Sequence, residues 1–143
     1  MNPIPEGFHT VTPYLLVKDA ANFLDFLKRA FGAVEAKKPY EQPKGTIVNA
    51  QVKIGDSVVM LGEAPEEHGP THSMLYLYVK DADAFFKAAV KAGAVSQHEV
   101  ADMFYGDRAG AVKDPAGNVW WIATHKEDVA PAELAKRAPA KKR

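Results

Sequence analysis

The sequence predicts an α+β fold in which two βαβββ modules form a curved mixed sheet with a concave inner face. The main observation is an internal repeat: residues 13–20 read Pro-Tyr-Leu-Leu-Val-Lys-Asp-Ala, and residues 75–82 read Leu-Tyr-Leu-Tyr-Val-Lys-Asp-Ala. A second match follows, because Gly-Ala-Val begins at Gly32 and again at Gly93. Matching segments at a nearly constant spacing indicate one structural unit used twice.

Each copy opens with a strand and a capped helix. A run rich in Val, Leu and Tyr predicts a strand of about five or six residues, and Asp19 or Asp81 follows it. Aspartate at that place accepts hydrogen bonds from backbone N–H groups of the first helical turn. The helices end at Gly32 and Gly93, since glycine tolerates the left-handed C-cap conformation. One face of each helix is apolar and predicted to be buried, namely Phe23, Leu27, Ala30 and Phe31 in the first helix and Phe85, Ala89 and Ala92 in the second.

Three further strands complete each module. Turn residues at 55–56 and 115–118 separate paired apolar segments, which is typical of hairpins. The predicted strands are 33–37, 46–54 and 57–61 in the first copy and 95–100, 109–113 and 119–123 in the second.

Residues 1–125 are predicted to form a single domain, with modules at about 8–63 and 73–125. An apolar fraction of 47% over 143 residues is enough for a hydrophobic core. Residues 126–143 are rich in Ala, Pro, Glu and Lys and are predicted to form a loose C-terminal tail.

Composition narrows the class of partner. The formal net charge is zero, which argues against nucleic acid or an anionic membrane as the partner and favours a small neutral ligand. Cysteine is absent, which excludes disulfides, thiolate nucleophiles and sulfur-rich metal sites. The first residues lack the pattern of a signal peptide, and no segment is apolar enough to span a bilayer. We expect a cytoplasmic protein.

Two βαβββ copies that end in Asp-Pro-Ala-Gly-Asn-Val-Trp-Trp-Ile at 114–122 resemble the vicinal oxygen chelate superfamily, which includes glyoxalases, bleomycin-resistance proteins and dioxygenases. The resemblance covers about residues 8–125. Four segments further resemble the PhnB-like subgroup: His-Thr-Val-Thr-Pro-Tyr-Leu from His9, Asp-Phe-Leu-Lys-Arg-Ala-Phe-Gly-Ala from Asp25, Tyr-Gly-Asp-Arg from Tyr105, and Ala-Thr-His-Lys-Glu-Asp-Val from Ala123.

The resemblance also implies where a metal would bind. Metal enzymes of this superfamily place one His, Gln or Glu on each of four equivalent strands around a divalent cation. The equivalent positions here are Thr12, Met60, Met74 and Trp121. The repeat supports this set, because it relates the first residue to the third and the second to the fourth. A hydroxyl, two thioethers and an indole do not replace imidazole or carboxylate ligands, so neither a metal nor another cofactor is predicted.

The candidate ligand-binding residues lie on the concave face or in the loop beside it: Thr12, Tyr14, Met60, Met74, Tyr76, Tyr105, Arg108 and Trp121. Tyr14 and Tyr76 each follow a lost metal position by two residues and so share its face of the strand. They and Trp121 either contact a ligand or are core aromatics. Arg108 suits a carboxylate or phosphate, although a local Asp107–Arg108 network that fixes the loop is the preferred interpretation.

These residues leave several functions open, with no catalytic residue assigned. The leading hypothesis is a metal-independent small-molecule binder that sequesters or detoxifies its ligand. A first alternative is a glyoxalase-like lyase or a dioxygenase whose cation is held by His9, His72 and His125, the last of which shares the strand face of Trp121 and lines a rim of the cup.

Two further alternatives need no metal. One is a lyase or isomerase that uses Tyr14, Tyr76 or Asp107 for proton transfer, and the other is a non-catalytic scaffold whose pocket is filled by its own side chains. In all cases a homodimer is predicted, because each module leaves unpaired sheet edges.

Overall fold

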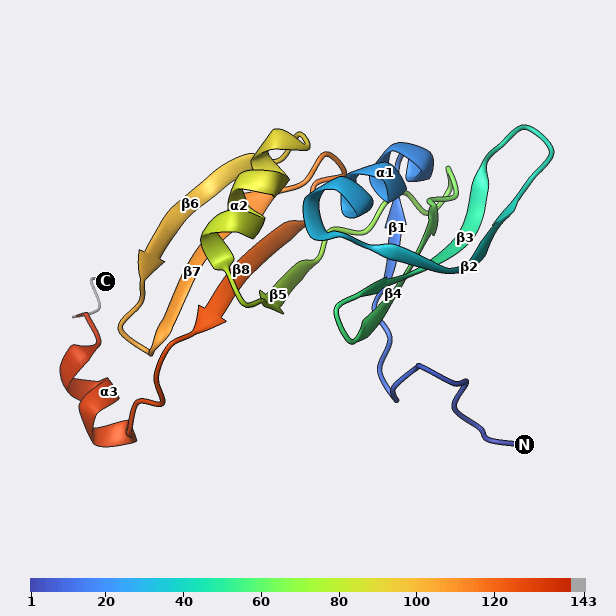
Figure 1. Cartoon of the computed structure of the whole chain (residues 1–143). Coiled ribbons are helices and arrows are strands. Elements are labelled where there is room, and N and C mark those ends of the chain that lie inside the picture. Colours follow the sequence, from blue (N-terminus) through green and yellow to red (C-terminus); the bar gives the residue numbers. More distant parts are fainter. Residues whose placement is uncertain (140–143) are drawn as a thin grey trace.

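The computed structural model describes residues 1–139 as two βαβββ modules followed by a short helix (Figure 1). The first module contains β1 (Tyr14–Val17), α1 (Ala20–Phe31), β2 (Val34–Glu41), β3 (Ile47–Ile54) and β4 (Ser57–Glu63). The second contains β5 (Met74–Tyr78), α2 (Ala82–Lys91), β6 (Val95–Asp102), β7 (Asp107–Lys113) and β8 (Val119–His125), and α3 (Pro131–Arg137) follows it.

The eight strands form two four-stranded sheets of the same topology. Their orders are β1-β4-β3-β2 and β5-β8-β7-β6. The first strand of each module pairs in parallel with the fourth, and the other pairs are antiparallel, so both sheets are mixed. The predicted α+β fold of two βαβββ modules is therefore confirmed, with each module keeping a sheet of its own.

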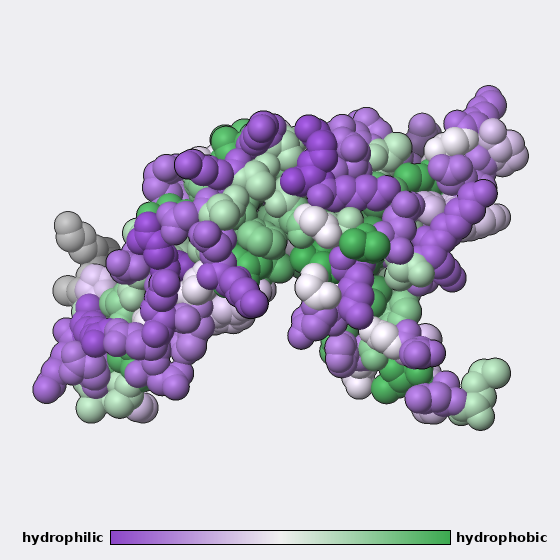
Figure 2. All heavy atoms as spheres, in the orientation of Figure 1, coloured by the Kyte–Doolittle hydropathy of each residue, from purple (hydrophilic) through white to green (hydrophobic). Residues whose placement is uncertain are grey.

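The helices α1 and α2 lie together on one side of the molecule, and the two sheets slope away beneath them (Figure 1). The sheet faces turned away from the helices line a hollow between the two modules. Figure 2 shows apolar residues at the top of this hollow and mainly polar ones on its outer rims. The concave face predicted from the sequence is thus present and open in the single chain.

Equivalent aspartate side chains cap both helix N-termini. Asp19 and Asp81 accept hydrogen bonds from backbone N–H groups in the first turns of α1 and α2, as predicted. A second acceptor comes from the fourth strand, because Glu63 binds the first N–H of α1 and the Thr124 hydroxyl binds that of α2, both at 2.9 Å. Each helix is thereby joined to the sheet that it covers, and the repeat extends to these contacts.

The C-terminal ends of the two helices differ. Gly32 caps α1 in the left-handed conformation with φ of 67°. Ala92 ends α2 in an ordinary right-handed conformation, and Gly93, the predicted cap, follows it with φ of 118°.

One hydrophobic core joins the two modules. Phe31, the last residue of α1, lies 4.8 Å from Trp120 and 6.5 Å from Phe85, measured between ring centroids. Trp120 is 1% exposed and faces the helices, as the alternation of β8 predicts, whereas its neighbour Trp121 is only partly buried. The side chain of Phe31 therefore fixes the first module against the second.

The segment predicted to be a loose tail contains α3, none of whose residues is buried. Two backbone N–H groups, those of Lys126 and Glu127, donate to the carbonyl of Gly106 and hold the start of this segment against the β6–β7 loop. The Arg137 side chain pairs with Glu127. Residues 140–143 lie outside the described part of the chain. None of the helices within residues 1–139 is long and apolar enough to cross a membrane.

Candidate functional site

The concave faces of the two sheets carry equivalent pairs of residues. Tyr14 on β1 lies beside Met60 on β4, and Tyr76 on β5 lies beside Trp121 on β8. Both pairs bridge the parallel strands of their module at the same register. The predicted equivalence of Met60 and Trp121 therefore holds in three dimensions.

In the first sheet, the pair is joined by an amide. Asn49 on β3 donates a hydrogen bond of 3.1 Å to the Tyr14 hydroxyl, and the same nitrogen lies 3.9 Å from the Met60 sulfur. Tyr14 remains 45% exposed. The polar groups at this pair are thus a neutral amide and a neutral hydroxyl.

In the second sheet, the pair is part of a larger aromatic group. The rings of Tyr76 and Trp121 are stacked, with centroids 6.4 Å apart and planes 14° apart. Between ring centroids, Tyr78 lies 5.1 Å from Tyr76 and His98 lies 5.4 Å from Trp121. Tyr76 and Tyr78 are 43% and 62% exposed, so both side chains remain accessible to a ligand. We call Tyr76, Tyr78, His98 and Trp121 the aromatic wall.

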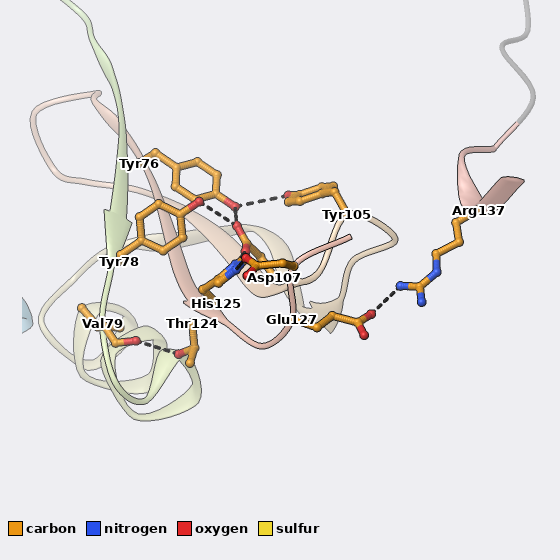
Figure 3. Close-up of polar contacts among 10 residues, drawn as sticks. Tyr76, Tyr78, Val79, Tyr105, Asp107, Thr124, His125, Glu127 and Arg137 are labelled. Atoms are coloured by element: carbon orange, nitrogen blue, oxygen red, sulfur yellow. Dashed lines mark hydrogen bonds and ion pairs between the residues drawn. The ribbon is translucent and has the colours of Figure 1, made fainter. Parts of the chain in front are cut away.

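A buried carboxylate organises the hydroxyl end of this wall (Figure 3). Asp107, which is 4% exposed, accepts hydrogen bonds from the hydroxyls of Tyr76 at 2.8 Å and Tyr78 at 3.0 Å, both through Oδ2. Its Oδ1 lies 2.8 Å from Nδ1 of His125. Tyr105 completes the group, with its hydroxyl 3.3 Å from that of Tyr76.

His125 lies between two carboxylates. Its Nε2 is 2.7 Å from Oδ1 of Asp128, and its Nδ1 faces Asp107. Because a carboxylate only accepts, both ring nitrogens donate, and this stabilises the imidazolium form. The hydrogen bonds to Asp107 and then to Asp128 accordingly raise the pKa of His125 above its ordinary value.

The pKa values of Asp107, Tyr76 and Tyr78 are shifted in the directions expected when a charged carboxylate accepts hydrogen bonds from its neighbours. Burial alone raises the pKa of Asp107, but hydrogen bonds from His125, Tyr76 and Tyr78 outweigh it and lower the pKa below its ordinary value. Burial, followed by the contacts with Tyr105 and Asp107, raises the pKa of Tyr76 strongly. The hydrogen bond to Asp107 is the main cause of a raised pKa at Tyr78. Asp107 is thus held as an anion and the two tyrosines as neutral phenols.

A groove of about 650 Å³ runs beside this network at the junction of the two modules. Its floor includes Phe31 and Phe85, one wall is the β3–β4 turn, and the other is β5 with Tyr76 and Tyr78. β5 is an end strand of its sheet, so its outer edge faces the groove. The groove is large enough for a small organic ligand.

The remaining predicted ligand-binding residues divide by position. The Tyr105 hydroxyl lies within hydrogen-bonding distance of the Tyr76 hydroxyl. Thr12 lies just before β1 and is half-buried, and Met74 begins β5 with 72% of its surface exposed. Arg108 points to the helix side, where it pairs with Asp83 at 2.8 Å and with Asp102 at 3.3 Å. The structure therefore gathers Tyr76, Tyr105 and Trp121 but does not bring Arg108 to them.

The local Asp107–Arg108 network considered from the sequence is wrong. β7 begins at Asp107, two residues earlier than predicted, and successive residues of a strand point to opposite faces. Asp107 consequently joins the tyrosines on the concave face, whereas Arg108 joins Asp83 of α2.

The two halves of the candidate site are separate within one chain. Within residues 1–139, no hydrogen bond or aromatic contact joins the Tyr14 group to the aromatic wall. In the same part of the chain, no group of three or more His, Asp or Glu side chains is placed to hold a metal ion. His9, His72 and His125 therefore do not form such a group there.

The four family metal positions do not fit a divalent cation. They hold Thr12 before β1, Met60 on β4, Met74 on β5 and Trp121 on β8. A hard cation needs oxygen or imidazole donors at short distance, and thioethers and an indole do not supply them. No chemical step is therefore assigned to a metal at this site.

Sequence reasoning missed Tyr78 and the central place of Asp107. Tyr78 lies two residues after Tyr76, so the strand alternation that identified one tyrosine also contained a signal for the other. Asp107 was assigned to a loop, and its contact with His125 depends on the pairing of β7 with β8. His125 does share the face of Trp121, as its parity predicted, and it lies at the rim beside Tyr78.

Comparison with known proteins identifies the family. The sequence profile of the Glyoxalase/Bleomycin resistance protein/Dioxygenase superfamily matches residues 7–122. The chain belongs to this superfamily. An uncharacterized protein of Mycobacterium bovis is 34% identical over 130 residues, which cover 83% of this chain and 85% of that protein.

Solved structures of the superfamily fold agree with this membership. TioX from Micromonospora sp. ML1 is 27% identical, with a TM-score of 0.69 over 82% of this chain and 98% of TioX. TnmS3 from Streptomyces sp. CB03234, described as an antibiotic binding protein, shares the fold with 22% identity and a TM-score of 0.64 over 82% of this chain and 96% of TnmS3.

Proposed function

We propose that this chain is a metal-independent binder of small aromatic molecules that acts as a cytoplasmic homodimer in sequestration or detoxification. The observation that carries the proposal is the aromatic wall, with Tyr76 and Trp121 stacked and partly exposed beside an open groove. Flat ring faces held in place by strands offer a large contact area at little cost in conformational entropy. Membership of the PhnB-like subgroup remains part of this proposal.

Three observations support binding over the alternatives. The residues at the metal positions are poor donors, which argues against a cation-dependent lyase or dioxygenase. The groove of about 650 Å³ argues against a pocket filled by its own side chains. Antibiotic binding is stated for TnmS3, a protein of the same fold, and we extend small-molecule binding to this chain only as a proposal.

The titration properties of the network also favour binding over metal-free proton transfer. A carboxylate whose pKa is lowered is a weak base, and a phenol whose pKa is raised is a weak acid. A general acid or base works best with a pKa close to the working pH. Asp107 and Tyr76 are shifted away from that range, so they suit recognition better than catalysis.

The binding proposal is tested with 1-naphthalenemethanol, a neutral planar probe, by calorimetry. Trp121→Ala is expected to weaken binding about tenfold, because it removes one member of the stacked pair. Val90→Ala, on the exposed face of α2, is the matched control and should bind as the unaltered chain does. Equal affinity of Trp121→Ala and the unaltered chain would contradict the proposal.

The proposed homodimer follows from the separation of the two half-sites. β1 and β5 are end strands of their sheets and are related by the repeat. A twofold axis that places β1 of one chain near β5 of another would bring a Tyr14 group to an aromatic wall and complete the cup. Val11, which directly precedes β1 and is 82% exposed, would be covered in this arrangement.

Sedimentation at micromolar concentration is therefore expected to give twice the chain mass of 15.6 kDa. Val11→Lys should shift the protein toward the monomer, since a buried unpaired charge opposes association. Val95→Lys, at an exposed position on the outer strand β6, should remain dimeric. A monomer for the unaltered chain would refute the dimer and leave only a site built within one chain.

A further inference from the structure

We infer that the aromatic wall selects aromatic ligands carrying a protonated amine over those carrying a carboxylate. This inference rests on the proposed binding function and names its ligand class. It comes from the direction of the hydrogen bonds around Asp107, which determine what the tyrosine hydroxyls present to the cup (Figure 3).

Each tyrosine hydroxyl has one hydrogen to donate and two lone pairs that accept. Tyr76 and Tyr78 both give their hydrogen to Oδ2 of Asp107. The hydrogen of Tyr105 is then the one shared between Tyr105 and Tyr76. One lone pair of Tyr76 and both of Tyr78 remain, so toward a ligand these two hydroxyls only accept.

The charges around the wall also favour a cationic ligand over an anionic one. His125 lies between the carboxylates of Asp107 and Asp128, so even with a protonated imidazole these three side chains carry one net negative charge. The charged residues among those lining the groove, Asp56 and Lys80, have opposite signs. Arg108, the residue suited to an anion, points to the opposite face of the sheet and is paired with Asp83.

The aromatic rings complete a site for an ammonium group. Tyr76 and Tyr78 pack against each other beside Trp121, and their ring faces attract a cation through the negative centre of the π system. A ligand whose ammonium group lies at the hydroxyl end would donate hydrogen bonds to the Tyr76 and Tyr78 oxygens while its aromatic ring stacks on the wall. A carboxylate there would meet only acceptors and the negative field of Asp107.

The test uses three probes with one naphthalene ring: 1-naphthylmethylamine, 1-naphthalenemethanol and 1-naphthoate. At neutral pH the amine should bind about tenfold more tightly than the alcohol, as one charge-assisted hydrogen bond allows, and the carboxylate more weakly than both. Asp107→Asn should bring the amine-to-alcohol ratio close to one, because an asparagine amide donates to the tyrosine oxygens and reorients their hydrogens outward.

Asp83→Asn removes a carboxylate from the helix side and should leave the ratio unchanged. Tyr78→Phe removes one acceptor at an exposed position, without changing charge, and should narrow the amine-to-carboxylate ratio even if Asp107→Asn fails to fold. Equal binding of the three probes would overturn the selectivity while leaving aromatic binding in place. Binding of none would overturn both.

Discussion

Replacement of Phe31 by alanine is expected to lower the free energy of unfolding by about 3–5 kcal/mol, the range for removing a large aromatic side chain from a packed core. Phe31 is 3% exposed. Its ring centroid lies 5.8 Å from that of Phe26, 6.5 Å from that of Phe85 and 4.8 Å from that of Trp120. Two of these partners belong to the second module, whereas Phe31 ends the helix of the first. The cavity would open where the modules meet, and neither module alone could close it.

Urea unfolding followed by circular dichroism measures this change. Phe104→Ala is the matched control, because Phe104 is 37% exposed in the β6–β7 loop and its loss should cost less than about 1 kcal/mol. If Phe31→Ala is as stable as this control, the two modules do not depend on the aromatic contact between them. Phe31→Ala should also weaken the binding of 1-naphthalenemethanol, since Phe31 forms part of the groove floor.

Patterns that are local in sequence predicted most of the fold. The repeat set the two modules, and Asp19 and Asp81 cap the helices as expected because a capping side chain acts within its own first turn. Strand alternation placed Trp120 toward the helices and Trp121 toward the concave face. These features depend only on a period of two or of 3.6 residues, which a sequence displays directly.

Contacts between distant segments were not predictable in the same way. Periodicity showed that Phe31 lies on the buried face of its helix, but not that its partners are Phe85 and Trp120 of the other module. The Asp107 network requires β5, β7 and β8 to be aligned in one register, and a shift of one residue would turn Asp107 toward α2. The candidate site was therefore predicted as a set of positions on the concave face and in the loop beside it, and Asp107 was considered only for proton transfer, without its contacts to the tyrosines and His125.

Asp114→Ala is expected to lower the free energy of unfolding by about 3 kcal/mol, because it leaves several buried donors without a partner. Asp114 is 4% exposed, and its Oδ1 accepts from the backbone N–H groups of Ala116 at 2.8 Å and Asn118 at 3.0 Å. Its Oδ2 accepts from the indole Nε1 of Trp120 at 2.7 Å. One carboxylate therefore fixes both the β7–β8 turn and the largest fully buried side chain of the core.

The turn in the first module supplies the control for this prediction. Asp56 occupies the β3–β4 turn and is exposed, and its carboxylate binds only the neighbouring Ser57 hydroxyl among the described residues, so Asp56→Ala should change stability by less than about 0.5 kcal/mol. Asp114→Asn should lie between the two, since its amide keeps one acceptor oxygen but turns an N–H₂ group toward a donor. Urea unfolding monitored by tryptophan fluorescence distinguishes the three variants. If Asp114→Ala is as stable as Asp56→Ala, the bonds of Asp114 are replaced by water on substitution, and the β7–β8 turn is held by its backbone conformation alone.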